Sequence, residues 1–349
     1  MSKIAANNHC GFQAMDSDAD PLDQPYIKAR RDKEPAKEDS RSEEKFLKTM
    51  SDETKRYAVV TGGNKGIGFE ICRQLASKGV VVILTARNER RGSEAVEKLK
   101  ACGFSDSVVF HQLDVADPAS VAEVADFIRT RFGKLDLLVN NAAVIGIVYK
   151  AENFMKAVEL AGDWPLESQV DWSELASQTY EMAEGCLKTN YYGTTLMVKA
   201  LLPLLQLCES ARIVNISSLL GNLEFISNEW AKGVFTDIEN LTEDLIKEVL
   251  DKFLKDFKEN SLKANGWPTA TSAYILSKAA MNAYTRMIAK AHPAILTNCV
   301  HPGFVKTDIT VGTGVLTAEE AAAFPVKLAL LPSGTPSGLF YSNGKACPF

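Results

Sequence analysis

From Tyr57 onward, short apolar segments alternate with segments of helical periodicity, and this alternation constrains the fold more than any other feature of the sequence. The apolar segments are nearly continuous, as in strands that are buried on both faces. A crossover between parallel strands needs an intervening element, usually a helix. The pattern therefore predicts an α/β domain with a doubly wound parallel sheet, whose strands fall at Tyr57–Val60, Val80–Thr85, Val108–Leu113, Leu135–Asn140, Arg212–Ser217 and Ile295–Val300.

The segments between these strands carry apolar residues three and four positions apart, as Ile67, Ile71 and Leu75 show. Such spacing places the apolar side chains on one face of a helix, which packs on the sheet. We expect helices at Gly66–Lys78, Ser93–Lys100, Ala119–Phe132, Tyr180–Leu207 and Ser272–Ala291.

Residues 1–56 differ from the rest of the chain because they are rich in charged residues and serine and have no sustained periodicity. Segments of this composition bury too little apolar surface to fold, so we expect a disordered extension followed by a single domain over 57–349. Met50 opens a short polar stretch that leads directly into the first strand. We take Met50 as a candidate native start, with residues 1–49 as an upstream extension.

Two long intervals, 146–177 and 223–267, interrupt the alternation of strands and helices. The second contains apolar residues at spacings of three and four from Ile238 to Phe257, which predicts an amphipathic helix that packs on the main domain. Long insertions of this kind commonly form lids or pocket walls. We therefore expect a helical flap near the active site.

Composition limits the classes of partner and cofactor. The net charge of −5 disfavours nucleic acid and anionic membranes, and no apolar run is long enough to span a bilayer. The seven cysteines form no C-x-x-C pair and only four histidines are present, so we expect no metal site. An odd cysteine count without a secretory signal indicates a reducing compartment, and we expect a cytoplasmic protein.

A glycine-rich stretch, Thr61–Gly68, follows the first strand and opens the first helix. Glycines there permit a tight turn and close approach of a pyrophosphate, while the helix offers free N–H groups. The alternative is an ordinary strand-to-helix turn. The expected cofactor-binding residues of this loop are Gly62, Asn64, Lys65, Gly66, Ile67 and Gly68.

The end of the second strand lacks the acidic residue that holds the ribose diol in NAD sites, and Arg87 lies there instead. Together with Lys65, Arg87 suits the 2′-phosphate of NADP(H), although both cations would also be unremarkable as solvated surface groups. Asp114, next to Val115, is placed to accept the adenine amino group, and Asn140 to hold the adenosine side. Either residue would serve equally well as a helix cap or strand tie.

Tyr274 and Lys278 are four residues apart in a predicted helix and so share one face. A neighbouring cation lowers the pKa of a tyrosine, which would let Tyr274 exchange a proton with a carbonyl oxygen. Ser218, just after a strand end, is placed to donate to that oxygen. An N-cap is the alternative role of such a serine; of the pair we assign Ser218 to catalysis and Ser217 to structure.

In these motifs and their order the chain resembles the short-chain dehydrogenases/reductases, a Rossmann-like family. The resemblance rests on Thr61–Gly68, Asn140–Ala143, Asn190, Ser218, Tyr274 with Lys278, and Pro302–Asp308. It implies that Tyr274 is the general acid and base, that Lys278 binds the nicotinamide ribose, and that Asn190 holds a water molecule. It adds Pro302, Gly303, Val305 and Thr307 as cofactor contacts, with Thr307 and the Val305 backbone anchoring the carboxamide.

The stretches Ser227–Gly233, Phe253–Lys258 and Gly266–Thr269 resemble the plant salutaridine reductase and menthone/neomenthol reductase branch of that family. This resemblance implies a monomer of plant specialised metabolism that reduces a bulky hydrophobic ketone, terpenoid or alkaloid in type, with NADPH. Iminium reduction and NADP-dependent alcohol oxidation are variants within the class. A non-catalytic NADPH-binding protein is the alternative outside it. The family's usual glycine is replaced by Ala143, which would strain the cofactor pocket if that position needed an unusual backbone angle.

The native start is tested by mass spectrometry of the endogenous N-terminus. We expect a mature protein that begins at Met50 or Ser51. An intact peptide that spans Phe46 to Lys55 would refute this start.

Overall fold

The computed structural model describes residues 55–166 and 169–349, and these residues form one compact unit. The expected disordered extension lies, apart from its last two residues, outside the described part of the chain. An eight-stranded sheet runs through the unit in the order β10-β9-β8-β7-β4-β1-β2-β3. Its strands are β1 (Tyr57–Val60), β2 (Val81–Ala86), β3 (Val108–Gln112), β4 (Leu137–Asn140), β7 (Arg212–Ile216), β8 (Leu296–His301), β9 (Phe340–Ser342) and β10 (Lys345–Cys347).

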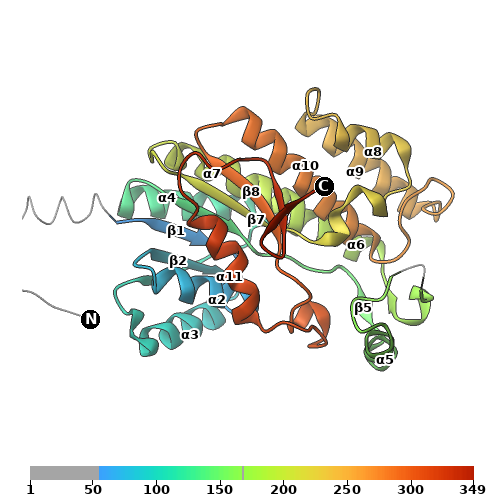
Figure 1. Ribbon diagram of the computed structural model, residues 1–349, viewed down its shortest axis with the longest axis horizontal. Coiled ribbons are helices and arrows are strands. Elements are labelled where there is room, and N and C mark those ends of the chain that lie inside the picture. The colour runs from blue at the N-terminus through green and yellow to red at the C-terminus, as the bar shows by residue number, and fades with distance from the viewer. Residues whose placement is uncertain (1–54, 167–168) are drawn as a thin grey trace, which may run out of the picture. The chain divides into compact units, whose positions relative to one another are not determined.

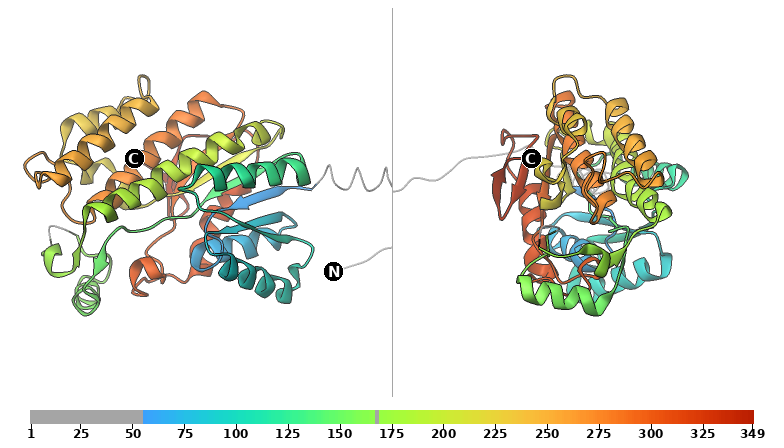
Figure 2. Two further views of the ribbon diagram at one scale, coloured as in Figure 1. Left: turned by 180° about the vertical axis from the view of Figure 1, so that it is seen from behind. Right: turned by 90° about the vertical axis from the view of Figure 1, so that its right-hand side faces the viewer.

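The predicted doubly wound α/β architecture is confirmed, because helices cover both faces of the sheet (Figures 1 and 2). One face carries α2 (Gly66–Ala76), α3 (Glu89–Leu99) and α11 (Ala318–Ala329). The other carries α4 (Pro118–Phe132), α6 (Tyr180–Leu187), α7 (Gly193–Leu205) and α10 (Ser272–Ala291). β1 pairs in parallel with both β2 and β4, so the strand order reverses there and opens a ligand-binding edge at the carboxyl ends.

Three local features differ from the sequence-based expectation. α3 begins four residues early, at Glu89, because the Asn88 side chain accepts from the Arg91 N–H (2.9 Å) and caps it. The helix expected over Tyr180–Leu207 is interrupted by a π-helical turn at Lys188–Tyr192. The last strand, β10, is antiparallel to β9, so the sheet is mostly rather than wholly parallel.

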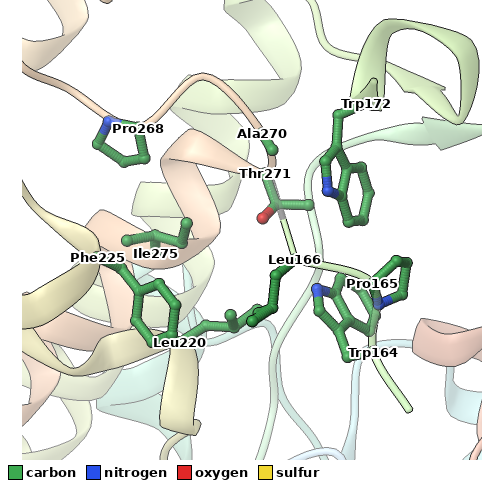
Figure 3. A pocket seen from close by; sticks show the side chains of 10 residues that line it. All are labelled: Trp164, Pro165, Leu166, Trp172, Leu220, Phe225, Pro268, Ala270, Thr271 and Ile275. Atoms are coloured by element: carbon green, nitrogen blue, oxygen red, sulfur yellow. The ribbon is translucent and has the colours of Figure 1, made fainter. Parts of the chain in front are cut away.

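The first insertion forms a two-stranded antiparallel ribbon, β5 (Val148–Tyr149) and β6 (Ala176–Ser177), which flanks α5 (Ala151–Ala161) and a 3₁₀ turn at Trp172–Glu174. It has its own small aromatic core, in which the rings of Trp164 and Trp172 lie 5.5 Å apart (Figure 3).

The second insertion contains two helices, α8 (Glu229–Thr236) and α9 (Glu243–Lys258). The predicted amphipathic helix therefore begins at Glu243 rather than near Ile238, because the Thr242 side chain caps it by accepting from the Leu245 N–H (3.2 Å). Its buried face includes Ile246, Val249, Leu250 and Phe253. The carboxylate of Asp256 accepts from Trp267 Nε1 (2.8 Å) and ties the helix to the chain that leads into α10.

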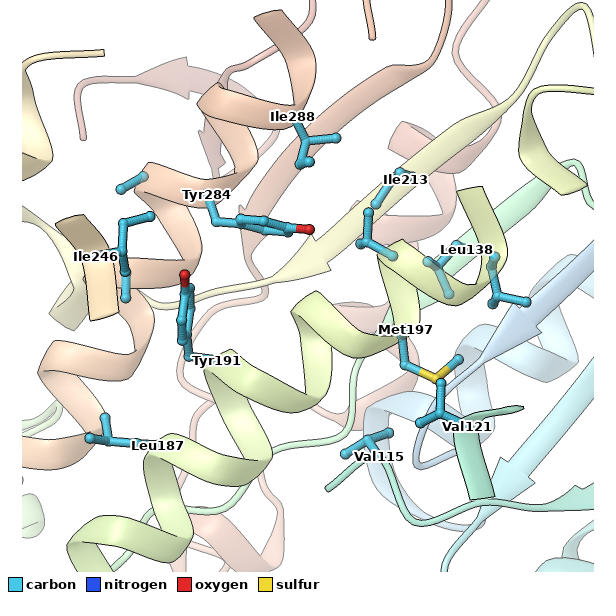
Figure 4. Packing of buried hydrophobic residues seen from close by; sticks show 14 of the residues in the cluster. Val115, Val121, Leu138, Leu187, Tyr191, Met197, Ile213, Ile246, Tyr284 and Ile288 are labelled. Carbon is cyan, nitrogen blue, oxygen red and sulfur yellow. The ribbon is translucent and has the colours of Figure 1, made fainter. Parts of the chain in front are cut away.

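The larger of the two main cores lies between the sheet and the helices α4, α7 and α10 (Figure 4). α10 is buried on almost its whole circumference, and alanines at positions 273, 279, 280 and 283 let it approach the sheet closely. Its bounds agree with those predicted. No helix in the described part of the chain is long and apolar enough to cross a membrane.

Candidate active site

The carboxyl ends of the parallel strands bring most of the sequence-predicted site residues to one edge of the sheet. The glycine loop follows β1, Arg87 follows β2, and Asn140 ends β4. Ser218 follows β7, and the segment from Pro302 to Thr307 follows β8. Residues far apart in sequence meet here because neighbouring strands run in the same direction.

The glycine loop has the backbone that a phosphate cradle needs. Gly62 and Gly66 have positive φ angles of 66° and 56°, and a Cβ on Gly68 would lie 2.4 Å from the Gly62 carbonyl oxygen. Lys65, at the N-cap of α2, makes no capping side-chain hydrogen bond. The first-turn N–H groups of α2 are thus left for an external acceptor, as in dinucleotide sites.

Asn141 holds this loop in place, a role that sequence reasoning did not assign. Its Nδ2 donates to the carbonyl oxygens of Thr61 (2.8 Å) and Gly62 (3.2 Å). The Thr61 hydroxyl in turn accepts from the N–H groups of Asn141 and Ala142, both at 2.9 Å. The signal was present as the second asparagine of the motif that starts at Asn140. Ala143 has no positive φ angle, so it adds no backbone strain of the kind that the sequence raised.

The residues expected at the adenosine end have different surroundings. Arg87 is exposed and has no ion-pair partner within residues 55–166 and 169–349, whereas Lys65 forms an ion pair with Asp308. Asp114 caps a turn by accepting from the Ala116 N–H (3.0 Å). Asn140 is 3% exposed and donates to Asn215 Oδ1 (2.8 Å). Asp114 and Asn140 therefore make the capping and strand-tying contacts named as alternatives, and their contacts to a cofactor stay predictions.

Val115 is buried and packs where α7 begins, since a Cβ on Gly193 would lie 2.8 Å from its Cγ2. Its side chain belongs to the main hydrophobic core, and a contact between Val115 and a cofactor stays a prediction.

The loop after β8 closes over the glycine loop. A Cβ on Gly66 would contact Thr307 Cγ2 at 3.5 Å, which places these two candidate cofactor residues together. Gly303 has a φ of 95°, and a Cβ there would lie 2.5 Å from Leu316 Cδ1. The Val305 carbonyl accepts from Thr310 Oγ1 (2.6 Å), so the backbone on both sides of Thr307 is internally fixed.

Tyr274, Lys278 and Ser218 converge at the centre of the edge. Lys278 is 1% exposed and donates from Nζ to the Ile216 carbonyl oxygen (2.6 Å), at the end of β7. Its Nζ lies 5.6 Å from the centre of the Tyr274 ring. The Ser218 hydroxyl acts on the Tyr274 hydroxyl by lowering its pKa, which places the two side chains close together. A hydroxyl pair and a cation therefore face one point, which suits the polarisation and protonation of an oxygen atom.

The pKa values of Tyr274 and Lys278 are both governed mainly by burial. Burial raises this pKa above its ordinary value of 10, and the hydrogen bond from Ser218 only partly opposes that effect. Burial also lowers the pKa of Lys278 to about 8. Burial is therefore the largest influence on the Tyr274 pKa in the polypeptide, and a lowering of that pKa by Lys278 stays a prediction.

Asn190 lies in the π-helical turn and is fully buried. Its side chain accepts from the Val144 N–H (2.9 Å) and donates to the Val144 carbonyl (2.9 Å) and to Ser277 Oγ (3.0 Å). Ser277 precedes Lys278, so Asn190 is joined to the catalytic helix. π-turns inside helices are frequent at functional sites, and this one turns the amide toward α10.

An apolar cavity lies between the first insertion and the start of α10 (Figure 3). Trp164 and Trp172 come from the first insertion, Thr271 is the N-cap of α10, and Ile275 lies in the first turn of that helix. Leu220 lines this cavity and Phe304 packs edge-on against Trp164 (6.0 Å between ring centres), whereas Leu219 is 40% exposed. The lining comprises Trp164, Pro165, Leu166, Trp172, Leu220, Phe225, Pro268, Ala270, Thr271 and Ile275.

The two tryptophans were missed from the sequence because 146–177 has no periodicity that assigns them to a face. Tyr149 was also missed; its hydroxyl donates to the Ile309 carbonyl (2.7 Å) and joins the first insertion to the loop after β8. In the described part of the chain, no group of three or more His, Cys, Asp or Glu side chains is arranged to hold a metal ion.

Comparison with known proteins gives consistent matches along this chain. The short chain dehydrogenase family model matches residues 56–230. A (+)-neomenthol dehydrogenase from Arabidopsis thaliana is 53% identical over 303 residues, which cover 86% of this chain and 100% of the relative.

Solved structures agree. That of salutaridine reductase from Papaver somniferum is 51% identical and has a TM-score of 0.76, with 82% of this chain and 99% of that chain covered. Menthone neomenthol reductase from Mentha piperita is 49% identical with a TM-score of 0.74, over 84% and 100% of the two chains.

A pair of glycine substitutions, one in the glycine loop and one outside it, distinguishes the free-energy cost of a left-handed backbone from that of steric crowding. Gly79 has a φ of 77°, and a Cβ added there would have no atom within 4 Å, so Gly79→Ala carries the cost of the left-handed backbone alone, about 1 kcal/mol. Gly62→Ala adds a Cβ only 3.1 Å from Ala142 Cα and is expected to lower the free energy of unfolding further. Denaturant titration measures both; equal losses would mean that the loop is not tightly packed.

Proposed function

The chain belongs to the short-chain dehydrogenase/reductase family, as an oxidoreductase of C=O and CH–OH groups, and on that premise we propose an NADPH-dependent reductase of bulky hydrophobic ketones. The observation that carries the proposal is the convergence of Ser218, Tyr274 and Lys278 at the ends of the strands, with an apolar cavity whose lining includes Leu220 and Ile275, their neighbours in sequence. The names of the relatives, which include salutaridine reductase and (−)-isopiperitenone reductase, support alkaloid or terpenoid substrates.

The residues at the sheet edge fit a dinucleotide. Gly62 and Gly66 supply the backbone turn, and the start of α2 supplies uncapped N–H groups for the pyrophosphate. The exposed Arg87 would hold a 2′-phosphate, and Lys65 would join it by leaving its surface ion pair with Asp308. Thr307, which lies beside Gly66, would bind the nicotinamide carboxamide. NADPH would supply the hydride.

The polypeptide's task is then to bind the ketone oxygen and deliver a proton to it. Ser218 would donate a hydrogen bond to that oxygen, and Tyr274 would transfer its hydroxyl proton. A tyrosine whose pKa lies above 10 keeps its proton at neutral pH, which suits the reductive direction. Lys278, with a pKa of about 8, remains mostly protonated at pH 7 and stabilises the phenolate that is left behind.

The hydrogen bond from Asn190 to Ser277 Oγ would help to hold the neighbouring Lys278 in position. Asn190 would also position the water molecule that returns a proton to the catalytic groups. The apolar lining of the cavity would favour a hydrophobic carbon skeleton around the ketone, since its walls are mainly aromatic and aliphatic.

Tyr274→Phe tests the proton donor. Loss of the hydroxyl is expected to lower kcat for NADPH-dependent ketone reduction about 10²- to 10⁴-fold, while the Kd for NADPH stays unchanged. Tyr284→Phe is the matched control, because Tyr284 lies on the same helix, is buried, and has a hydroxyl with no hydrogen-bond partner among the described residues. Undiminished turnover by Tyr274→Phe would refute the mechanism. NADPH binding without turnover of any ketone by the wild type would favour a non-catalytic role.

Arg87→Asp tests the choice of cofactor. Loss of a charge-assisted phosphate contact is expected to raise the Kd for NADPH about 10- to 100-fold and to leave the Kd for NADH nearly unchanged. Arg129→Asp, on the exposed surface of α4, makes the same change in net charge away from the sheet edge. Equal changes for both cofactors would remove Arg87 from the 2′-phosphate site.

A further inference from the structure

The segment from Ser217 to Gly221 carries Ser218, and both of its ends are bound to the side chain of Asn282. Asn282 Oδ1 accepts from the Ser217 hydroxyl (2.6 Å), and its Nδ2 donates to the Gly221 carbonyl oxygen (3.2 Å). Ser217 and Asn282 are each 2% exposed. One amide therefore fixes the start and the end of the short turn that presents the serine hydroxyl.

Asn282 also shares a helix face with the other catalytic groups. Tyr274, Lys278 and Asn282 follow one another at intervals of four on α10, so their side chains project from the same side of the helix. The helix that places the tyrosine thus also holds the turn that places Ser218. The separation between the two hydroxyls is then set by a single rigid element rather than by two independent loops.

The turn is pressed against α10 as well as bound to it. A Cβ on Gly221 would lie 2.9 Å from both the main-chain carbon and the Cβ of Lys278, and 3.0 Å from Asn282 Nδ2. On the strand side, the Lys278 ammonium binds the Ile216 carbonyl oxygen. Contacts at positions 216, 217 and 221 therefore enclose Ser218 and leave it little freedom to shift.

We propose that Asn282 is a positioning residue that sets the distance between the Ser218 and Tyr274 hydroxyls. The inference rests on the proposed ketone reduction, since it assigns Asn282 a part in that reaction. Ser218 Oγ accepts a 3.2 Å hydrogen bond from the Leu220 N–H, which lies within the turn and so does not tie the turn to α10. Released from Asn282, the turn would move relative to Tyr274, and a displacement of about 1 Å at reacting groups can cost roughly 100-fold in rate.

The experiment compares Asn282→Ala and Ser217→Ala with Asn298→Ala as the matched control. Asn298 is likewise 2% exposed and binds the backbone through both amide atoms, to Pro336 and Leu339, but on the far side of β8. For each variant, kcat, the KM for ketone, the Kd for NADPH and the free energy of unfolding are measured. All three lose stability through lost buried hydrogen bonds.

Only the first two variants are expected to lose kcat, about 10- to 100-fold, with the Kd for NADPH unchanged. Their pH profiles for alcohol oxidation should also move to higher pH, because a weaker bond from Ser218 raises the pKa of Tyr274. Ser217→Thr keeps the hydroxyl, so its kcat should lie within about 3-fold of the wild-type value. The double variant Ser217→Ala/Asn282→Ala should have a kcat no lower than that of either single variant, because both substitutions break the same contact.

A kcat for Asn282→Ala and Ser217→Ala that equals that of Asn298→Ala would overturn the inference, as would independent, multiplicative losses in the double variant. Should Asn282→Ala not fold, the comparison of Ser217→Ala with Ser217→Thr decides alone. If the wild-type protein reduces no ketone, the proposed function itself is overturned. This result is distinct from an active wild type whose kcat is not lowered by the Asn282 and Ser217 substitutions.

Discussion

The site depends on one buried interaction, the hydrogen bond from the Lys278 ammonium to the Ile216 carbonyl at the end of β7. A cation without solvent is costly unless it is hydrogen-bonded, and burial has already lowered the pKa of Lys278 to about 8. The bond joins the middle of α10 to a central strand. It therefore fixes the position of α10 relative to the sheet, and with it the positions of Tyr274 and Asn282 at the carboxyl ends of the strands.

Two other features of the fold assemble the site around this contact. The parallel strands bring the glycine loop, the serine turn and the loop after β8 to one edge, although the sequence separates them widely. The two insertions then cover that edge with apolar walls, of which Trp164 and Trp172 form one side. Polar groups thus gather at the strand ends and apolar surface lines the nearby cavity, a combination that suits a ketone on a large carbon skeleton.

Much of this was predictable from local patterns. Hydrophobic periodicity gave the bounds of α10 as Ser272–Ala291, and the spacing of Tyr274 and Lys278 placed both on one helical face. The glycine motif between β1 and α2 indicated a phosphate cradle. These features need only short-range information, because helix faces, caps and turns are determined by residues a few positions apart.

Other features depend on long-range packing and left no local signal. The hydrogen bond between Ser217 and Asn282 joins positions 65 residues apart, and no sequence pattern near either residue predicts it. The rise in the Tyr274 pKa follows from burial by surrounding elements, whereas the neighbouring lysine alone suggested a fall. The π-helical turn at Asn190 and the antiparallel β10 likewise follow from contacts with other segments.

Delivery of hydride to the carbon of a substrate carbonyl, whose oxygen Tyr274 protonates, is tested most directly with a labelled cofactor. The cofactor is NADPH deuterated at the transferable position, and the substrate is a terpenoid enone. We predict an alcohol that carries the deuterium on the former carbonyl carbon, formed as NADPH is consumed in equal amount. Deuterium at a carbon of the double bond with the ketone intact, or cofactor binding without any transfer, would contradict this mechanism.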